Sequence, residues 1–142
     1  MTRRISTGIA LILLAAAASA TRGDTPVTRR PLDNTAAREG KVLYVRECSA
    51  CHGERGDGKG PAADFTDPRP RNFTKRLFKL RSTESGQPPA TSDILKTIEH
   101  GIPGSAMPSF AFLGEDERKA IAAYVLKLAD MLEEPEIGRA HV

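Results

Sequence analysis

The sequence has 142 residues, of which 39% are hydrophobic, 27% charged and 5% aromatic, and it contains no Trp. This length suits one domain rather than a multidomain enzyme. The formal net charge of +3 falls to +1 without Arg3 and Arg4, a surplus too small to predict a nucleic-acid partner.

The first twenty residues have the pattern of a secretory signal. Arg3 and Arg4 precede a charge-free apolar run at residues 9–17, and Ala18-Ser19-Ala20 forms an A-x-A cleavage pattern. The run is shorter than the roughly 20 residues of a membrane-spanning helix, which favours cleavage over an uncleaved membrane anchor. We therefore expect a signal peptide over residues 1–20 and a periplasmic protein that meets membranes only through redox partners or an uncleaved signal.

The sequence beyond the signal is poor in apolar residues. About 35% of residues 21–142 are hydrophobic, so the chain by itself supplies a thin core. This composition suggests that an apolar group absent from the sequence completes the interior.

The first expected helix follows a flexible leader at residues 21–32. Asp33 or Asn34 is a suitable N-cap for a helix over residues 35–48. Gly40 lies inside that helix, where glycine costs about 1 kcal/mol relative to alanine, so we expect it to pack closely against another element.

Two further helices are expected after a long loop. Residues 53–70 contain four Gly and three Pro, which predicts a loop. Residues 71–81 allow a short helical turn around four apolar side chains: Phe73, Leu77, Phe78 and Leu80. The second helix is expected to begin at a Thr91 or Ser92 cap and to end at Gly101, with Ile94, Leu95 and Ile98 on one face.

The last helix is expected to begin near Gly114. Its first turn is acidic, which the helix dipole favours, and its apolar stripe consists of Ile121, Tyr124, Val125 and Leu128. Residues 132–142 have the composition of a frayed tail. No strand-like alternation of useful length is present, so the sequence predicts an all-α domain at residues 33–131 with three main helices and long loops.

The chemistry of the chain is concentrated in its only two cysteines. Cys48 and Cys51 stand in a C-x-x-C-H motif with His52, the attachment pattern of c-type haem. Two thiols on one helical turn can form thioethers with the two vinyl groups of haem, and the adjacent histidine then reaches the iron.

Three other interpretations of this motif compete with haem attachment. A disulfide between Cys48 and Cys51 would close a very small loop and stabilise little. A thiol redox pair is expected after a strand and before a helix, whereas here a helix precedes the motif and a Gly-rich loop follows it. A tetrahedral zinc site needs further soft ligands, and the chain has no other Cys.

A second axial ligand is expected at Met107. It lies in a loop of small residues before a proline, outside any helical stripe, where a methionine serves poorly as core filler. His100 is the main competitor, although the dipole at a helix end already explains a histidine there. Met131 is expected to pack or to be exposed, and His141 lies in the tail without an evident role.

The sequence resembles the class I monohaem cytochromes c of bacteria. The matching segments occur in order over residues 36–129: residues 40–44, the motif at 48–53, residues 58–62, residues 101–110 and residues 117–125. The resemblance implies one covalent haem c wrapped by the long loops of a small cytochrome c fold. Many relatives have a Trp near the haem edge that this chain lacks, which leaves the contacts to the propionates open.

The resemblance also implies roles for individual residues. Gly40 would allow the first helix to cross the last one closely, against Tyr124. Pro61 would lie on the proximal side, where a backbone carbonyl accepts the Nδ1–H of His52. Met107 would be the distal ligand. The implied pocket lining is Phe110, Ile102, Ile94, Leu95, Ile98 and Leu113, and the implied propionate partners are Arg71, Asn72 or Arg81.

An iron with two protein ligands has no open position for a substrate, so we expect electron transfer rather than catalysis. The expected function is that of a periplasmic one-electron carrier that docks transiently with a redox donor and a redox acceptor. The alternatives are a haem c subunit or domain of one respiratory or dehydrogenase complex, a ligand-binding or peroxidatic haem protein, and a thiol–disulfide oxidoreductase without haem.

Overall fold

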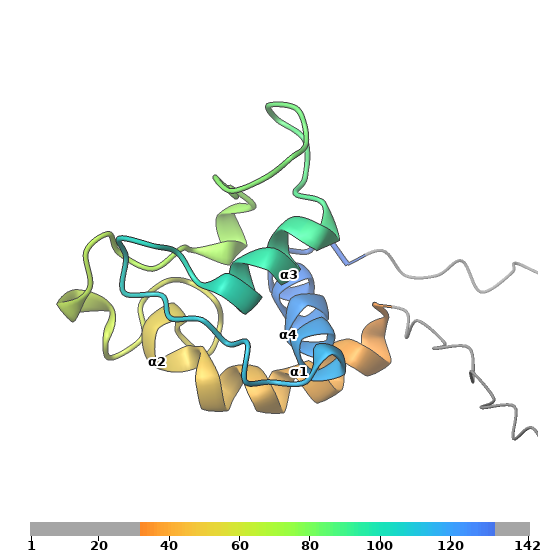
Figure 1. The fold of residues 1–142 in the computed structure, drawn as a ribbon, viewed down its shortest axis with the longest axis horizontal. Coiled ribbons are helices and arrows are strands. Elements are labelled where there is room, and N and C mark those ends of the chain that lie inside the picture. Colours follow the sequence, from red (N-terminus) through yellow and green to blue (C-terminus); the bar gives the residue numbers. More distant parts are fainter. Residues whose placement is uncertain (1–31, 133–142) are drawn as a thin grey trace, which may run out of the picture.

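The computed structural model describes residues 32–132, which form four α-helices (Figure 1). Cys48 alone separates the first two helices, and long loops join the others. The helices are α1 (Asn34–Glu47), α2 (Ser49–His52), α3 (Thr91–His100) and α4 (Glu115–Leu128). Two 3-10 turns, Ala63–Phe65 and Phe73–Lys75, lie in the segment between α2 and α3. The described residues contain no strand, in agreement with the predicted all-α class.

The predictions for both ends of the chain lie outside the described residues. These are the signal peptide, the leader before Leu32, and the tail beyond Leu132. Within residues 32–132, no helix combines the length and the apolar character that a membrane crossing requires.

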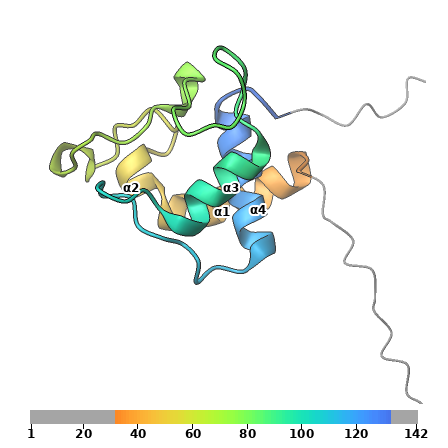
Figure 2. The same cartoon turned by 45° about the horizontal axis from the view of Figure 1, so that its top comes forward.

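The crossing of α1 over α4 organises the fold (Figures 1 and 2). Gly40 is buried at this crossing, and a Cβ atom on it would lie 1.8 Å from the carbonyl oxygen of Ala120. One turn further along, the rings of Tyr44 and Tyr124 meet edge to face with their centroids 5.1 Å apart. The expected close-packing role of Gly40 is confirmed, with the backbone at Ala120 as its direct contact.

The core lies between these two helices and α3. Its largest fully buried side chains are Tyr44 and Ile121, around which α3 and the following loop place Ile94, Ile98, Phe110 and Leu113. The apolar stripe expected on the last helix is buried at Ile121, Tyr124 and Val125 and half-buried at Leu128. In the expected turn at residues 71–81, only Phe73 is buried, whereas Leu77 and Leu80 are exposed.

Local chemistry defines most helix ends. The Asp33 carboxylate accepts a hydrogen bond from the Ala36 amide at 2.8 Å and caps α1. Gly101 ends α3 with φ +68°, and Gly114 begins α4, as predicted. The predicted cap of α3 is wrong, because the helix begins at Thr91 and the carboxylate of Asp93, inside its first turn, accepts the Ala90 amide at 3.0 Å.

Asp93 also closes the loop that precedes α3. Its Oδ2 atom accepts the backbone amide of Ser82 at 2.9 Å, the Ser82 hydroxyl at 3.1 Å and the Ala90 amide. One buried carboxylate thus holds both ends of the loop 82–90, which protrudes at the top of Figure 1. The hydrogen bonds from Ser82 lower the pKa of this carboxyl below its usual value of 3.8 and outweigh the opposing effect of burial.

We expect Asp93→Asn to lower the melting temperature of the holoprotein at about pH 7, because the amide cannot accept three hydrogen bonds as a carboxylate does. A lowered folded-state pKa gives stability that is present above the unfolded value and is lost as the pH falls through the folded value. The melting temperatures of wild type and variant should therefore converge in acid, when thermal unfolding is followed at about pH 7 and about pH 2. Glu84→Gln, in the same loop, is the matched control, and an equal effect of both changes at pH 7 would contradict the assignment.

Candidate functional site

The C-x-x-C-H motif occupies the junction of α1 and α2. Cys48 ends α1 with its amide bonded to the Tyr44 carbonyl at 2.8 Å, and its own carbonyl accepts the amides of Cys51 and His52 at 3.2 and 2.9 Å. Gly53 then ends α2 with φ +76°, and its carbonyl accepts the Tyr44 hydroxyl at 2.8 Å. The chain therefore presents both thiols and the imidazole from one helical turn.

Both cysteines are unpaired and half-buried. Burial raises the pKa of Cys48 to about 12, with smaller contributions from Glu47 and Cys51. Thiols that carry out disulfide exchange have lowered pKa values, because the thiolate is the nucleophile. Cys48 has the opposite character, which disfavours the thiol–disulfide oxidoreductase interpretation.

His52 is fixed by one hydrogen bond and one ring contact. Its Nδ1 atom lies 3.0 Å from the carbonyl oxygen of Arg71, and its ring stacks on Phe73 with centroids 4.6 Å apart. A carbonyl only accepts, so this bond places the proton on Nδ1 and leaves the lone pair on Nε2. Burial lowers the pKa of His52 more than the Arg71 bond raises it, which favours the neutral imidazole that binds metals.

The carbonyl that orients His52 is not at Pro61, where the resemblance placed it. The chain after Gly60 lies against α2, because Ala62 donates to the Ala50 carbonyl at 2.8 Å and a Cβ on Gly60 would lie 2.3 Å from the same oxygen. Pro61 is exposed there. The backbone at Arg71 takes the expected place of the carbonyl, ten residues further along the chain.

Two glycines bring Arg71 to this position. The Gly56 carbonyl accepts the Phe73 amide at 2.7 Å, and a Cβ on Gly58 would lie 2.8 Å from the Pro70 carbonyl. Both glycines have positive φ angles, of +69° and +73°. The loop after the motif and the segment 70–73 therefore pack backbone to backbone beneath the imidazole.

Met107 lies half-buried in the loop 101–114. The Ile102 amide donates to the Met107 carbonyl at 3.1 Å, and the Met107 amide donates to the Ser105 hydroxyl at 3.2 Å, so the segment forms a compact turn. The loop runs from α3 past the α2 end of the molecule before it returns to α4 (Figures 1 and 2). The fold thus brings the segment of Met107 to the side where the motif lies.

The other predicted site residues have varied surroundings. Phe110 is 8% exposed and belongs to the core, whereas Ile102 is half-buried. His100 is exposed, and its Nδ1 lies 3.0 Å from the Lys96 carbonyl. Met131 packs against the core, and His141 lies outside the described residues. Helix-end bonding therefore accounts for His100 and packing for Met131.

Two of the three expected propionate partners are used within the chain. The Asn72 side chain accepts the amide and the hydroxyl of Thr74 at 2.9 and 2.7 Å, which caps the turn at Phe73–Lys75. Arg81 donates to the carbonyls of Phe78 and Glu84 at 2.9 and 3.3 Å. Arg71 is half-buried beside the imidazole that its carbonyl holds.

The two thiols and the imidazole fit a metal that is already coordinated by an organic ring. Across residues 32–132, no group of three or more His, Cys, Asp or Glu side chains is placed to bind a bare ion. Two adjacent thiols that are not joined to each other, and one imidazole with Nε2 left for a metal, match the needs of a covalently attached metalloporphyrin.

Sequence reasoning did not identify the two groups that hold His52. The Arg71 carbonyl leaves no sequence signal, because every residue carries one. Phe73 was expected only to form a helical turn, although an aromatic residue within a strongly basic segment was an available sequence signal.

Comparison with known proteins agrees with this geometry. A chain of the reducing HAO-like protein complex of Kuenenia stuttgartiensis is similar in structure, with a TM-score of 0.63 and 39% sequence identity. The match covers 69% of this chain but only 46% of that one, so this chain spans less than half the length of the similar chain. The cytochrome c family profile matches residues 37–129, from α1 to the end of α4. The chain therefore belongs to the cytochrome c family, whose cofactor is covalent haem c with its iron.

Proposed function

We propose that this protein is a periplasmic carrier that transfers single electrons through one haem c, and that His52 and Met107 are the residues that would bind its iron. The observation that carries the proposal is the turn of α2, which presents Cys48, Cys51 and His52 together while Arg71 holds the Nδ1–H of the imidazole. When bound, haem c supplies an iron centre that takes up and releases one electron.

Each residue of the site then has a defined task. Cys48 and Cys51 hold the group through thioether bonds, and His52 offers Nε2 to the iron. The Arg71 carbonyl and the Phe73 ring fix the orientation of the imidazole, and an oriented second-sphere bond tunes a metal site. Met107 would offer its thioether to the iron, and a thioether ligand raises the reduction potential relative to a second histidine.

The surroundings of the site suit transient redox partners. Lys75 and Lys79 are exposed in the segment after the Arg71 carbonyl, and such cations steer an oppositely charged partner. We expect a donor and an acceptor that each bury a small interface, which permits rapid exchange. Export to the periplasm rests on the signal pattern of residues 1–20.

A second function is favoured by one comparison. The similar chain of Kuenenia stuttgartiensis comes from a protein complex and is more than twice as long as the part that this chain matches. By this analogy the chain would be the haem c subunit of one redox complex instead of a free carrier. Affinity purification of the exported protein from its own cells distinguishes the two, because a subunit is recovered with fixed partners in constant proportion.

The ligation by Met107 is tested by spectra of the exported holoprotein and of its Met107→Ala variant. We expect the oxidised wild type to show the weak far-red band of Met–Fe(III) and the reduced wild type to bind CO slowly or not at all. Met107→Ala should lose the band and bind CO readily, and Met131→Ala, a substitution at a residue that packs against the core, is the control. A wild type without the band that binds CO readily would overturn the carrier proposal in favour of a ligand-binding haem protein.

A further inference from the structure

The segment after Met107 is tied to the last turn of α3. The Ser109 hydroxyl donates to the Glu99 carbonyl at 2.5 Å, and the Phe110 amide donates to the Ile98 carbonyl at 3.0 Å. The carbonyls of a helix's last turn have no partner within the helix, so a loop that satisfies them becomes attached to the helix. The chain is therefore fixed two and three residues beyond Met107.

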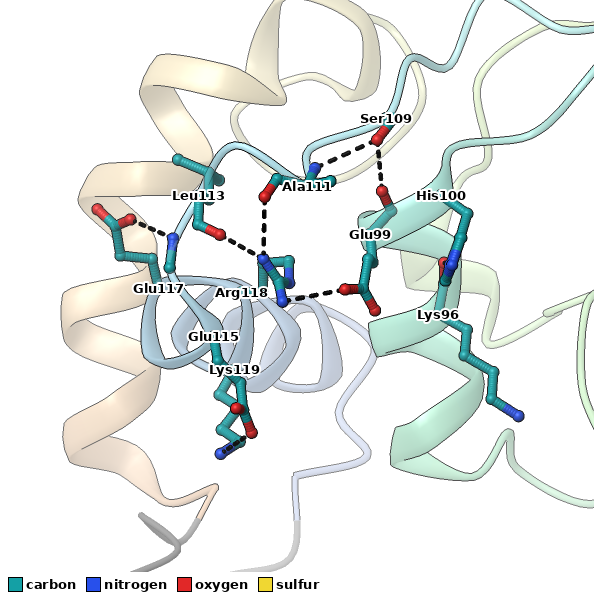
Figure 3. Close-up of polar contacts among 11 residues, drawn as sticks. Lys96, Glu99, His100, Ser109, Ala111, Leu113, Glu115, Glu117, Arg118 and Lys119 are labelled. Atoms are coloured by element: carbon teal, nitrogen blue, oxygen red, sulfur yellow. Dashed lines mark hydrogen bonds and ion pairs between the residues drawn. The ribbon is translucent and has the colours of Figure 1, made fainter. Parts of the chain in front are cut away.

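Arg118 of α4 holds the same loop from the other side (Figure 3). Its guanidinium donates to the carbonyls of Ala111 and Leu113 in the loop and pairs with the Glu99 carboxylate of α3 at 3.2 Å. The Arg118 side chain is only 14% exposed, so it is largely shielded from water. One side chain therefore joins α3, α4 and the loop between them.

The chemistry of this contact requires arginine. A guanidinium has five N–H donors in a planar fork and can serve several acceptors in different directions, whereas a lysine ammonium is a compact charge. Hydrogen bonds from a charged donor are stronger than those between neutral groups. Removal of Arg118 would leave two loop carbonyls and the Glu99 carboxylate without this donor.

The contacts of Lys119 show the contrast. Lys119 is the next residue of α4, also with a side chain 14% exposed, but its ion pairs run to Glu115 and Asp116 of its own helix. Figure 3 shows the Lys119–Glu115 pair turned away from the loop that Arg118 contacts. The two neighbouring cations thus differ in whether they reach the Met107 loop.

We propose that Arg118 and Ser109 are positioning residues that keep Met107 at its iron-binding position by anchoring the loop 108–114 to α3 and α4. This inference rests on the proposed ligation by Met107. The anchors act beyond the ligand on the C-terminal side, while the Ser105 hydroxyl and the Ile102 amide fix the turn on its N-terminal side. Without the anchors the loop would open locally and expose the distal position.

The test uses the exported holoprotein with Arg118→Leu, Ser109→Ala and the control Lys119→Leu. We expect Arg118→Leu to weaken the far-red Met–Fe(III) band and to raise the rate of CO binding to the reduced protein about tenfold, the factor that corresponds to one charged hydrogen bond. Lys119→Leu should leave the far-red band and the rate of CO binding as in wild type. Ser109→Ala should weaken the band and raise the CO rate, as Arg118→Leu does. Ser109→Ala also provides the test if the Arg118→Leu protein does not fold.

Amide hydrogen exchange gives a readout that does not depend on the iron. Exchange at Phe110 and Leu113 should accelerate in Arg118→Leu and not in Lys119→Leu. An Arg118→Leu protein that melts at a lower temperature yet keeps the full band and the wild-type CO rate would overturn the positioning role. A wild type without the band would instead overturn the ligation by Met107 and this inference with it, so the two failures are distinguishable.

Discussion

The double substitution Cys48→Ser with Cys51→Ser is expected to yield a colourless chain without a cooperative unfolding transition. The core formed by the described residues is small, and its largest fully buried side chains are Tyr44 and Ile121. A haem contributes several hundred Å2 of apolar surface, which at roughly 25 cal/mol per Å2 amounts to about 10 kcal/mol. That amount is comparable with the whole stability of a domain, roughly 5–15 kcal/mol.

The measurement is the thermal unfolding of chains exported in a host with haem c maturation, followed by circular dichroism. Ala50→Ser is the matched control, since it adds a hydroxyl at an exposed position of the same turn and removes neither thiol. A compact, colourless double variant that melts cooperatively would contradict the role of haem in the core.

Gly40→Ala is expected to have the second large effect, a loss of about 3 kcal/mol in the free energy of unfolding. The new Cβ would lie 1.8 Å from the Ala120 carbonyl oxygen and 3.0 Å from the Ile121 amide nitrogen. Both are backbone atoms of α4, so no side chain can rotate away. The helices must separate, and the contact between the rings of Tyr44 and Tyr124 is then disturbed.

Gly114→Ala is the matched control for this substitution. A Cβ at Gly114 would meet only the Glu117 carboxylate, at 3.5 Å, and the φ angle there is −61°. We expect less than about 1 kcal/mol at this N-cap position. Guanidinium unfolding of the Gly40→Ala and Gly114→Ala holoproteins compares their free energies of unfolding directly. Equal values would contradict the prediction, because they would show that α1 and α4 can separate at their crossing without a large loss of stability.

The parts of the fold that local chemistry determines were predictable. The Asp33 cap, the stop at Gly101 and the start at Gly114 each depend on residues within one helical turn. The start of α3 was predicted one or two residues too late, because the N-cap is Ala90, whose side chain cannot cap, and the Asp93 carboxylate accepts its amide instead. The bonds from Ser82 to Asp93, eleven residues apart, have no periodic signature in the sequence.

The candidate site divides in the same way. Cys48, Cys51 and His52 are neighbours in the sequence, and their spacing alone indicated the cofactor. The carbonyl that holds His52 was expected near Pro61 but belongs to Arg71, because the approach of segment 70–73 to Gly56 and Gly58 is a tertiary contact. Main-chain groups provide that bond, so composition and periodicity do not reveal it.

The anchoring by Arg118 was equally hidden. In the sequence it is one of several charged residues near the start of the last helix, with Lys119 beside it. Only the fold distinguishes the two, since the acceptors of Arg118 are loop carbonyls and a carboxylate from α3. The anchoring role of Arg118 depends on where the loop 108–114 meets α4.

The mass of the intact exported chain, measured under denaturing conditions, shows whether a haem is covalently attached to Cys48 and Cys51. Thioether bonds survive unfolding, whereas a haem bound only through His52 and Met107 is released. We predict the mass of the chain plus one haem, and the mass of the chain alone for the variant without Cys48 and Cys51. A wild-type chain with the mass of the polypeptide alone, carrying free thiols or a Cys48–Cys51 disulfide, would contradict covalent attachment of haem.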